Sequence, residues 1–310
     1  MADPSASAFE IEAGARPSLS IALRTVVPDF WALTKPEVNF LIVIATFTGF
    51  YLGCTPDLNA FPFWRLLNTL CGTLLVASGT GALNQYLEYR FDSLMRRTCR
   101  RPVAAGRVRP ATAAWFGISL AITGAAYLLI AVNALASALA VLTLTSYLFV
   151  YTPLKRRTPL CTLAGAVPGA MPPLIGWAAA SGSIISGKAW ILYVVLFLWQ
   201  FPHVMAIAWM YHEDYARAGY FVLPAKNERT FVAWLTGVPS LALFLASLAA
   251  VAASSEGVFQ YSATVVLGSG LLYYAVRKLL VPSRIAARQL LKATIVFLPL
   301  EFLILVLGRR

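Results

Sequence analysis

The fold is decided by residues 67–92, which read LNTLCGTLLVASGTGALNQYLEYRFD. Residues 67–83 are mostly apolar or small, as in a membrane-spanning helix, and polar groups appear where that helix reaches its end. Asn84, Glu88 and Asp92 are spaced four residues apart, so on a helix they share one face over about 12 Å. Carboxylates on such a face are costly to leave unpaired at a bilayer boundary. The face therefore predicts a site for Mg²⁺, which prefers hard oxygen ligands and shares them with substrate phosphates.

The composition is that of a polytopic membrane protein. Of the 310 residues, 59% are hydrophobic and 12% are charged, and the mean hydropathy is +0.71. In a soluble protein, the net charge of +12 would suggest a nucleic-acid partner. Here the basic residues lie in short loops between apolar segments, so membrane topology accounts for the charge. We therefore expect no nucleic acid as a partner and the lipid bilayer as the surroundings.

Nine apolar segments are each close to the ~20 residues that a helix needs to cross a bilayer. They predict an all-α fold, a bundle of nine transmembrane helices in one domain that covers residues 29–310. Residues 1–28 are rich in Ala, Ser and Pro and are expected to form a flexible cytoplasmic tail. The nine segments are about 38–54, 64–91, 111–132, 135–151, 160–180, 189–211, 230–253, 259–281 and 289–308.

Positive charge alternates between the loops. The loops after the second, fourth and sixth segments and the end of the eighth are rich in Arg and Lys, whereas the loops at 55–63, 133–134, 181–188 and 254–258 carry almost none. By the positive-inside rule the basic loops are cytoplasmic. We expect a location in the cell inner membrane, with the N-terminus and the active site at the cytoplasmic face and the C-terminus on the opposite side.

Two segments contain residues that break helices. The fifth has three prolines and two glycines between Ala164 and Pro173, and the sixth contains Gln200-Phe201-Pro202-His203. Broken helices survive in a membrane only where the freed backbone groups face protein or a cavity. We expect both interruptions to face a site, with an ordinary proline kink in a packed helix as the alternative for each.

Charged clusters follow the second, fourth and sixth segments, on the same predicted face of the membrane. The first continues from Asp92 to Arg96 and Arg97, the second is YTPLKRR at 151–157, and the third is YHEDYARAG at 211–219. Carboxylates would hold Mg²⁺, while guanidinium and ammonium groups bind phosphate oxygens directly. A single basic loop is more commonly explained by topology alone. Acidic and basic clusters together on one face predict a diphosphate site, where charge develops on a leaving group.

These motifs are similar to those of the UbiA superfamily of intramembrane prenyltransferases, over nearly the whole chain. The asparagine and two acids within 84–92 mark the superfamily. MxRT at 95–98, YTPLKR at 151–156, and WQFPH at 199–203 followed by EDYxxAG at 213–219 resemble its haem-farnesylating branch. The resemblance implies transfer of the farnesyl group of farnesyl diphosphate to the 2-vinyl group of haem b, giving haem O. Haem is then a substrate rather than a prosthetic group, and it would pass to a haem-modifying enzyme or a terminal oxidase.

The resemblance also implies roles for individual residues. Four that match the two metal motifs are the expected metal ligands and, with Lys155, the expected catalytic residues: Asn84, Glu88, Asp92 and Asp214. Four basic residues are expected to bind the diphosphate: Arg96, Arg97, Lys155 and Arg156. Glu88 stands where many relatives have Asp. The second motif lacks the two aspartates of aromatic-acceptor members, which leaves open whether it holds a metal ion.

Both histidines of the chain are candidates for haem binding. His203 and His212 are nine residues apart, so on a regular helix they point to opposite sides, and joint ligation of one iron is not expected. His203 follows Pro202 inside an apolar segment, and imidazole is a common axial ligand of haem iron. We rank His203 above His212, with a buried structural histidine as an alternative of about equal weight.

Two other functions stay open at the level of the sequence. An enzyme of the same fold that prenylates an aromatic quinone precursor would share the first motif, but the WQFPH run and the third cluster argue against it. A haem or lipid transporter without chemistry would have similar broken helices. It has no evident need for an acidic face beside basic clusters, which favours the enzyme.

Overall fold

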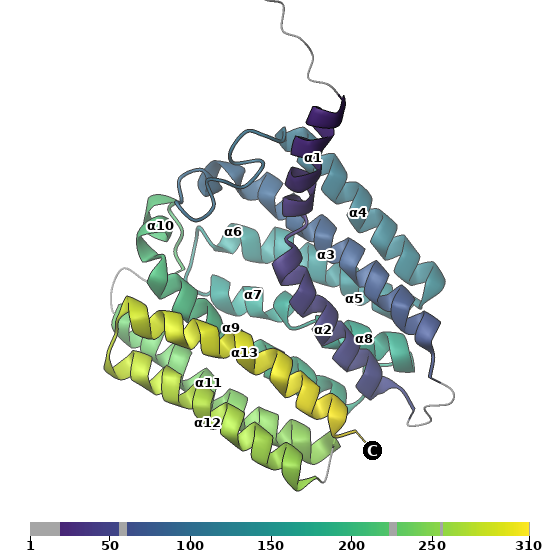
Figure 1. Cartoon of the computed structure of the whole chain (residues 1–310), viewed down its shortest axis with the longest axis vertical. Helices are drawn as coiled ribbons and strands as arrows, with labels where there is room; N and C mark the ends of the chain where they lie inside the picture. The colour runs from purple at the N-terminus through teal and green to yellow at the C-terminus, as the bar shows by residue number, and fades with distance from the viewer. Residues whose placement is uncertain (1–18, 56–60, 223–227, 255–256, 310) are drawn as a thin grey trace, which may run out of the picture.

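The computed structural model describes residues 19–55, 61–222, 228–254 and 257–309, and the regular secondary structure of these ranges is helical throughout (Figure 1). Nine stretches of the described chain are long and apolar enough to cross a membrane, which confirms the predicted bundle. They are Pro36–Gly53 (α2), Phe63–Asp92 (α3), Pro110–Ala131 (α4), Ala134–Leu154, Cys161–Ser181, Gly187–Met210 (α9), Arg229–Ala253, Val258–Leu280 (α12) and Arg284–Leu307 (α13).

Shorter elements divide or flank these spans. They are α1 (Leu19–Leu33), α5 (Ala134–Thr145), the π-helix η2 (Ser146–Tyr151), α6 (Thr152–Leu154), α7 (Cys161–Gly169), α8 (Pro172–Ser181), α10 (His212–Arg217) and α11 (Glu228–Ser254). Residues 1–18 of the predicted tail lie outside the described ranges, and residues 19–28 belong to α1. Apolar packing holds this helix, because Phe30 and Leu33 join a cluster with residues of α3 and α4, and the rings of Phe30 and Phe116 meet edge to face at 4.9 Å.

The helices pack in two groups that meet around α2. In the first group α3 lies against α4, and α2 lies against α8; in the second, α9 lies against α11 and α13, and α12 contacts α11 and α13. Contacts of α2 with α3, α9 and α13 join the two groups (Figure 1). The loop after α3, helix α6 and helix α10 gather at one end of the bundle, which we call the polar end, and the C-terminus lies far from it (Figure 1).

One of the two predicted helix breaks is present. The fifth span is divided, because α7 ends at Gly169 and Pro172 begins α8, at a helix position where a missing N–H is tolerated. The predicted break in the sixth span is wrong, since α9 is continuous and contains Pro202. A lone proline removes one backbone hydrogen bond, and packing of α9 on α11 and α13 keeps the rest of this apolar helix intact.

The π-helix η2 interrupts the fourth span directly before the second charged cluster. Such wide turns are rare and occur frequently at functional sites. Tyr147 and Tyr151 both lie on η2, with ring centroids 5.0 Å apart, and both line the cavity described below. No sequence pattern predicts this turn, which places two aromatic rings between the charged cluster and the interior of the bundle.

Candidate active site

A buried acidic face lies at the polar end of α3. Asn84, Glu88 and Asp92 are 1%, 5% and 1% exposed, in agreement with the single inward face that their spacing predicts. Buried carboxylates are stable only when they are paired or hydrogen-bonded. The partners of this face therefore decide what the site can bind.

Two of these side chains form ion pairs with partly buried basic side chains. Lys155 Nζ lies 2.8 Å from Glu88 Oε1. Arg101 Nη1 donates to both carboxylate oxygens of Asp92, at 3.0 and 2.8 Å. Charge-assisted bonds of this kind are the strong ones in proteins. Lys155 was predicted from its motif, whereas Arg101 was missed. The available signal for Arg101 was its position in a basic run nine residues after Asp92.

Lys35 completes the basic side of the site, and the sequence analysis did not predict it. Its Nζ donates to Asn84 Oδ1 at 2.5 Å. Lys35 precedes α2 with φ = 55°, in the left-handed region that is uncommon for a non-glycine residue and is enriched at functional sites. Burial, together with the positive charge of Arg101, lowers the pKa of Lys35 from 10.5 to about 7.

The third charged cluster joins the first through Arg97. Asp214 on α10 is 5% exposed, pairs with Arg217 of the same helix, and accepts the backbone N–H of Arg97 at 3.2 Å. The Arg97 guanidinium lies over the rings of Tyr211 and Tyr215, with its carbon 5.4 and 6.0 Å from their centroids. The structure thus brings the predicted residues Arg97 and Asp214 together.

The second cluster contacts both of the others. The backbone N–H of Phe221, just after α10, donates to the carbonyl oxygen of Lys155 at 2.7 Å. The Arg156 guanidinium lies over the ring of Phe91 on α3, 4.3 Å from its centroid. Arg96 is exposed on the loop after α3. All four predicted basic residues therefore lie at the polar end, with Lys155 the most buried of them.

Tyr220 is another residue that the sequence analysis missed. It is 7% exposed, and its ring lies 5.9 Å from that of Phe91 and 6.1 Å from that of Tyr215. Burial and the nearby charge of Glu88 raise the pKa of its phenol. The phenol therefore keeps its proton and stays a hydrogen-bond donor beside the acidic face.

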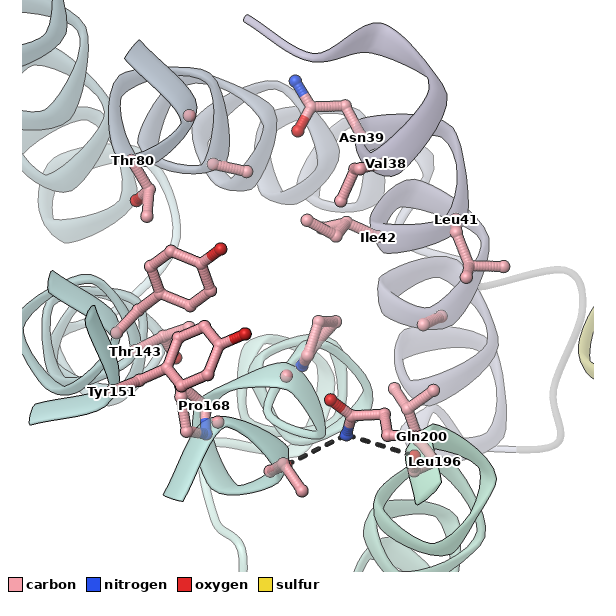
Figure 2. A pocket seen from close by; sticks show the side chains of 18 of the residues that line it. Val38, Asn39, Leu41, Ile42, Thr80, Thr143, Tyr151, Pro168, Leu196 and Gln200 are labelled. Atoms are coloured by element: carbon pink, nitrogen blue, oxygen red, sulfur yellow. Dashed lines mark hydrogen bonds between the residues drawn. The ribbon is translucent and has the colours of Figure 1, made fainter. Parts of the chain in front are cut away.

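A cavity of about 260 Å³ extends from this cluster into the bundle, between α2, α3, α5, η2, α7, α8 and α9. Lys35 and Tyr151 line its polar end. In Figure 2, Val38 and Ile42 of α2 face Tyr151 across the cavity. Gln200 lies on the α9 side, where its Nε2 donates to a carbonyl oxygen of α7 at 3.0 Å. The remaining walls are mainly apolar, which suits a hydrocarbon chain.

The structure separates the two histidines. His203 Nδ1 lies 2.9 Å from Thr294 Oγ1 of α13, and its ring stacks on Trp199 at 4.5 Å. Among the described residues that line the cavity, Trp199 is present and His203 is not. His212 is exposed, and its Nδ1 lies 3.1 Å from the carbonyl oxygen of Trp209. A haem contact of either histidine therefore stays a prediction.

The oxygen donors suit Mg²⁺ in the company of a substrate. Within the described ranges, no three His, Cys, Asp or Glu side chains lie close enough to hold a metal ion by themselves. Mg²⁺ is typically bound by one or two carboxylates plus substrate phosphates. Glu88 and Asp92, with the amide oxygen of Asn84, fit that pattern, and the paired Lys and Arg side chains suit the same phosphates.

Comparisons with known proteins give the family and the fold of the chain. The model of the UbiA prenyltransferase family matches residues 42–300. A protoheme IX farnesyltransferase from Solibacter usitatus is 41% identical over 288 residues, 91% of this chain and 98% of the relative. The structure of a digeranylgeranylglyceryl phosphate synthase has the same fold, with a TM-score of 0.70, 16% identity, and coverage of 91% of this chain and 98% of the other. A UbiA homologue from Archaeoglobus fulgidus, solved with GPP and Mg²⁺, has a TM-score of 0.56, 13% identity, and coverage of 89% and 99%.

Proposed function

Because the chain belongs to the UbiA prenyltransferase family, we propose that it transfers the farnesyl group of farnesyl diphosphate to the 2-vinyl group of haem b, giving haem O and diphosphate. One observation carries the proposal. A buried cluster of acids and bases that suits a diphosphate lies at the end of an apolar cavity that suits a prenyl chain. The name of the relative supports haem as the acceptor.

The polar cluster would bind the leaving group. Three buried or partly buried basic side chains contact the acidic face and would bind phosphate oxygens: Lys35, Arg101 and Lys155. Arg97 and Arg156 extend this basic surface, and Arg96 lies further out. Four residues are the proposed metal ligands: Asn84, Glu88, Asp92 and Asp214. When bound, Mg²⁺ would stabilise negative charge as the bond from carbon C1 to the diphosphate oxygen breaks.

The cavity would hold the hydrocarbon part and keep water away from the allylic cation. The rings of Tyr147 and Tyr151 lie between the phosphate end and the apolar walls, where their faces favour a cation. Carbon C1 then bonds to the terminal vinyl carbon of haem. The positive charge moves to the carbon next to the porphyrin, water adds there, and one proton is released, which gives the hydroxyethylfarnesyl group.

We further propose a location in the cell inner membrane with the polar end at the cytoplasmic face, because the basic loops gather at this end. The product would pass to a haem-modifying enzyme or to a terminal oxidase. His203 is the proposed haem contact, with its ring oriented by Thr294.

The test is mass spectrometry of haem after incubation of the purified chain with farnesyl diphosphate and Mg²⁺, with diphosphate release measured in parallel. We expect a hydroxyethylfarnesyl haem and an equal amount of diphosphate. If haem stays unmodified but an aromatic quinone precursor is prenylated with release of diphosphate, the acceptor is a quinone precursor and not haem. If neither acceptor leads to diphosphate release, the alternative of a non-catalytic transporter is favoured.

A further inference from the structure

The cavity ends inside the membrane part at five buried side chains, one from each of five surrounding helices. Each is the lining residue that lies furthest along its helix from the polar end. We call them the floor residues: Ala45 (α2), Thr73 (α3), Ala140 (α5), Ile175 (α8) and Leu196 (α9). All are at most 3% exposed, so the floor separates the cavity from tightly packed core.

Two helices give the same depth for this floor. Ala45 lies ten positions after Lys35 on α2, and Thr73 lies eleven positions before Asn84 on α3. Lys35 and Asn84 are hydrogen-bonded to each other, so both counts start from one point. At 1.5 Å per residue, the floor lies roughly 15 to 17 Å from the polar cluster.

At the level of the floor, the backbones of α2 and α8 touch. A Cβ added to Gly49 would lie 2.0 Å from the carbonyl oxygen of Pro173, and one added to Gly176 would lie 2.0 Å from that of Thr46. Gly49 is one turn past Ala45, and Gly176 directly follows Ile175. No side chain fits between the helices at these points, so a hydrocarbon chain cannot continue there either.

The depth corresponds to a chain of three isoprene units. With carbon–carbon bonds of about 1.5 Å, an extended farnesyl chain spans roughly 14 Å, a geranyl chain roughly 9 Å and a geranylgeranyl chain roughly 19 Å. We propose that the floor residues, Ala45 above all, limit the bound prenyl chain to the farnesyl length. Ala45 has the smallest side chain among the α2 residues that line the cavity, so a larger residue at this position would shorten the cavity. This inference rests on the proposed function, since it assigns the cavity to a prenyl diphosphate.

The experiment measures binding of unreactive geranyl, farnesyl and geranylgeranyl thiolodiphosphates to the full chain with Mg²⁺, in the absence of haem. Wild type should prefer farnesyl over geranylgeranyl by roughly tenfold or more, since one misplaced methylene in an apolar pocket changes affinity about 10- to 200-fold. Ala45→Leu should lower farnesyl affinity by roughly tenfold while geranyl affinity changes little. Ala126→Leu is the matched control, because Ala126 is exposed on α4 and does not line the cavity.

Leu196→Ala provides an independent arm if Ala45→Leu does not fold. It removes bulk from the floor and should raise geranylgeranyl affinity relative to farnesyl by roughly tenfold. Equal losses of geranyl and farnesyl affinity in Ala45→Leu, or an unchanged length preference in Leu196→Ala, would overturn the inference. Failure of the proposed function looks different: wild type would then bind by length but transfer no farnesyl group to haem.

Discussion

Lys155 and Glu88 form a buried ion pair that ties the end of α6 to the acidic face of α3, with 2.8 Å between Nζ and Oε1. Burial alone would lower the pKa of Lys155, but the Glu88 carboxylate raises it well above the usual value. The ammonium therefore stays charged. It also lies over the ring of Tyr151, 4.4 Å from the centroid, at the edge of the cavity. One side chain thus connects the acidic face with the space that would hold the prenyl chain.

Lys155→Met should both destabilise and inactivate the protein. The change leaves the Glu88 carboxylate buried without its cation, which typically costs about 3–5 kcal/mol. The double variant Lys155→Met/Glu88→Gln should regain most of the unfolding free energy, because no buried charge is left unpaired. It should not regain turnover, since both phosphate and metal contacts are lost. Denaturation in detergent measures the stability, and diphosphate release measures the turnover. If a stable double variant still turns over, Lys155 and Glu88 are not needed for the reaction.

Asp92→Asn should lower turnover by roughly a hundredfold or more, the usual effect of removing one charge-stabilising group. The carboxylate accepts two bonds from Arg101 and is a proposed metal ligand. Asp29→Asn is the matched control, because Asp29 pairs with the half-exposed Arg107 and neither residue is a proposed ligand of metal or diphosphate. That change should cost at most about 1 kcal/mol and leave turnover unchanged. Equal turnover of the two variants would contradict a role for Asp92.

The lowered pKa of Lys35 predicts that the free energy of unfolding rises with pH. Its pKa is about 7 in the folded chain and near 10.5 when unfolded. Between these values the unfolded state binds more protons, so the free energy of unfolding increases as the pH rises from about 7 toward 10.5. Lys35→Met should flatten this slope. Thermal unfolding in detergent at about pH 7 and pH 9 tests it, and an identical slope in both proteins would show that Lys35 is protonated throughout.

His203→Ala should weaken haem binding more than farnesyl diphosphate binding if the ring contacts the acceptor. His212→Ala, at an exposed position, should leave haem affinity nearly unchanged. Thr294→Val removes the hydrogen-bond partner of the His203 ring without touching the histidine and should shift the haem absorption spectrum. If the haem absorption spectrum and the haem affinity are unchanged in both His203→Ala and Thr294→Val, His203 is a structural residue of the contact between α9 and α13.

The spans and the acidic face could be predicted because their signals are local. A membrane leaves the backbone few alternatives to a helix, so the nine apolar runs correspond to the nine spans found in the described residues. Four-residue spacing likewise places Asn84, Glu88 and Asp92 on one face whatever surrounds them. Only the choice of partners depends on the rest of the fold.

The parts that could not be predicted depend on distant contacts. Lys35 reaches Asn84 across 49 positions of sequence, and Lys155 reaches Glu88 across 67. The left-handed backbone of Lys35 and the π-turn before Lys155 have no pattern of their own. The continuity of α9 through Pro202 was missed for the same reason, because packing rather than local propensity decides it.

Gly49→Ala should destabilise the bundle and widen its length preference. The new Cβ would lie 2.0 Å from a backbone oxygen of Pro173, which cannot rotate away, so α2 and α8 must separate. Overpacking of this kind costs about 1–3 kcal/mol, and the separation should admit geranylgeranyl thiolodiphosphate. Gly270→Ala is the control: Gly270 is exposed on α12 with nothing within 4 Å of the new Cβ, so helix propensity should stabilise it by up to about 1 kcal/mol. If both variants unfold at the same temperature, α2 and α8 are not held at backbone contact, and the closed floor beneath Ala45 loses its physical basis.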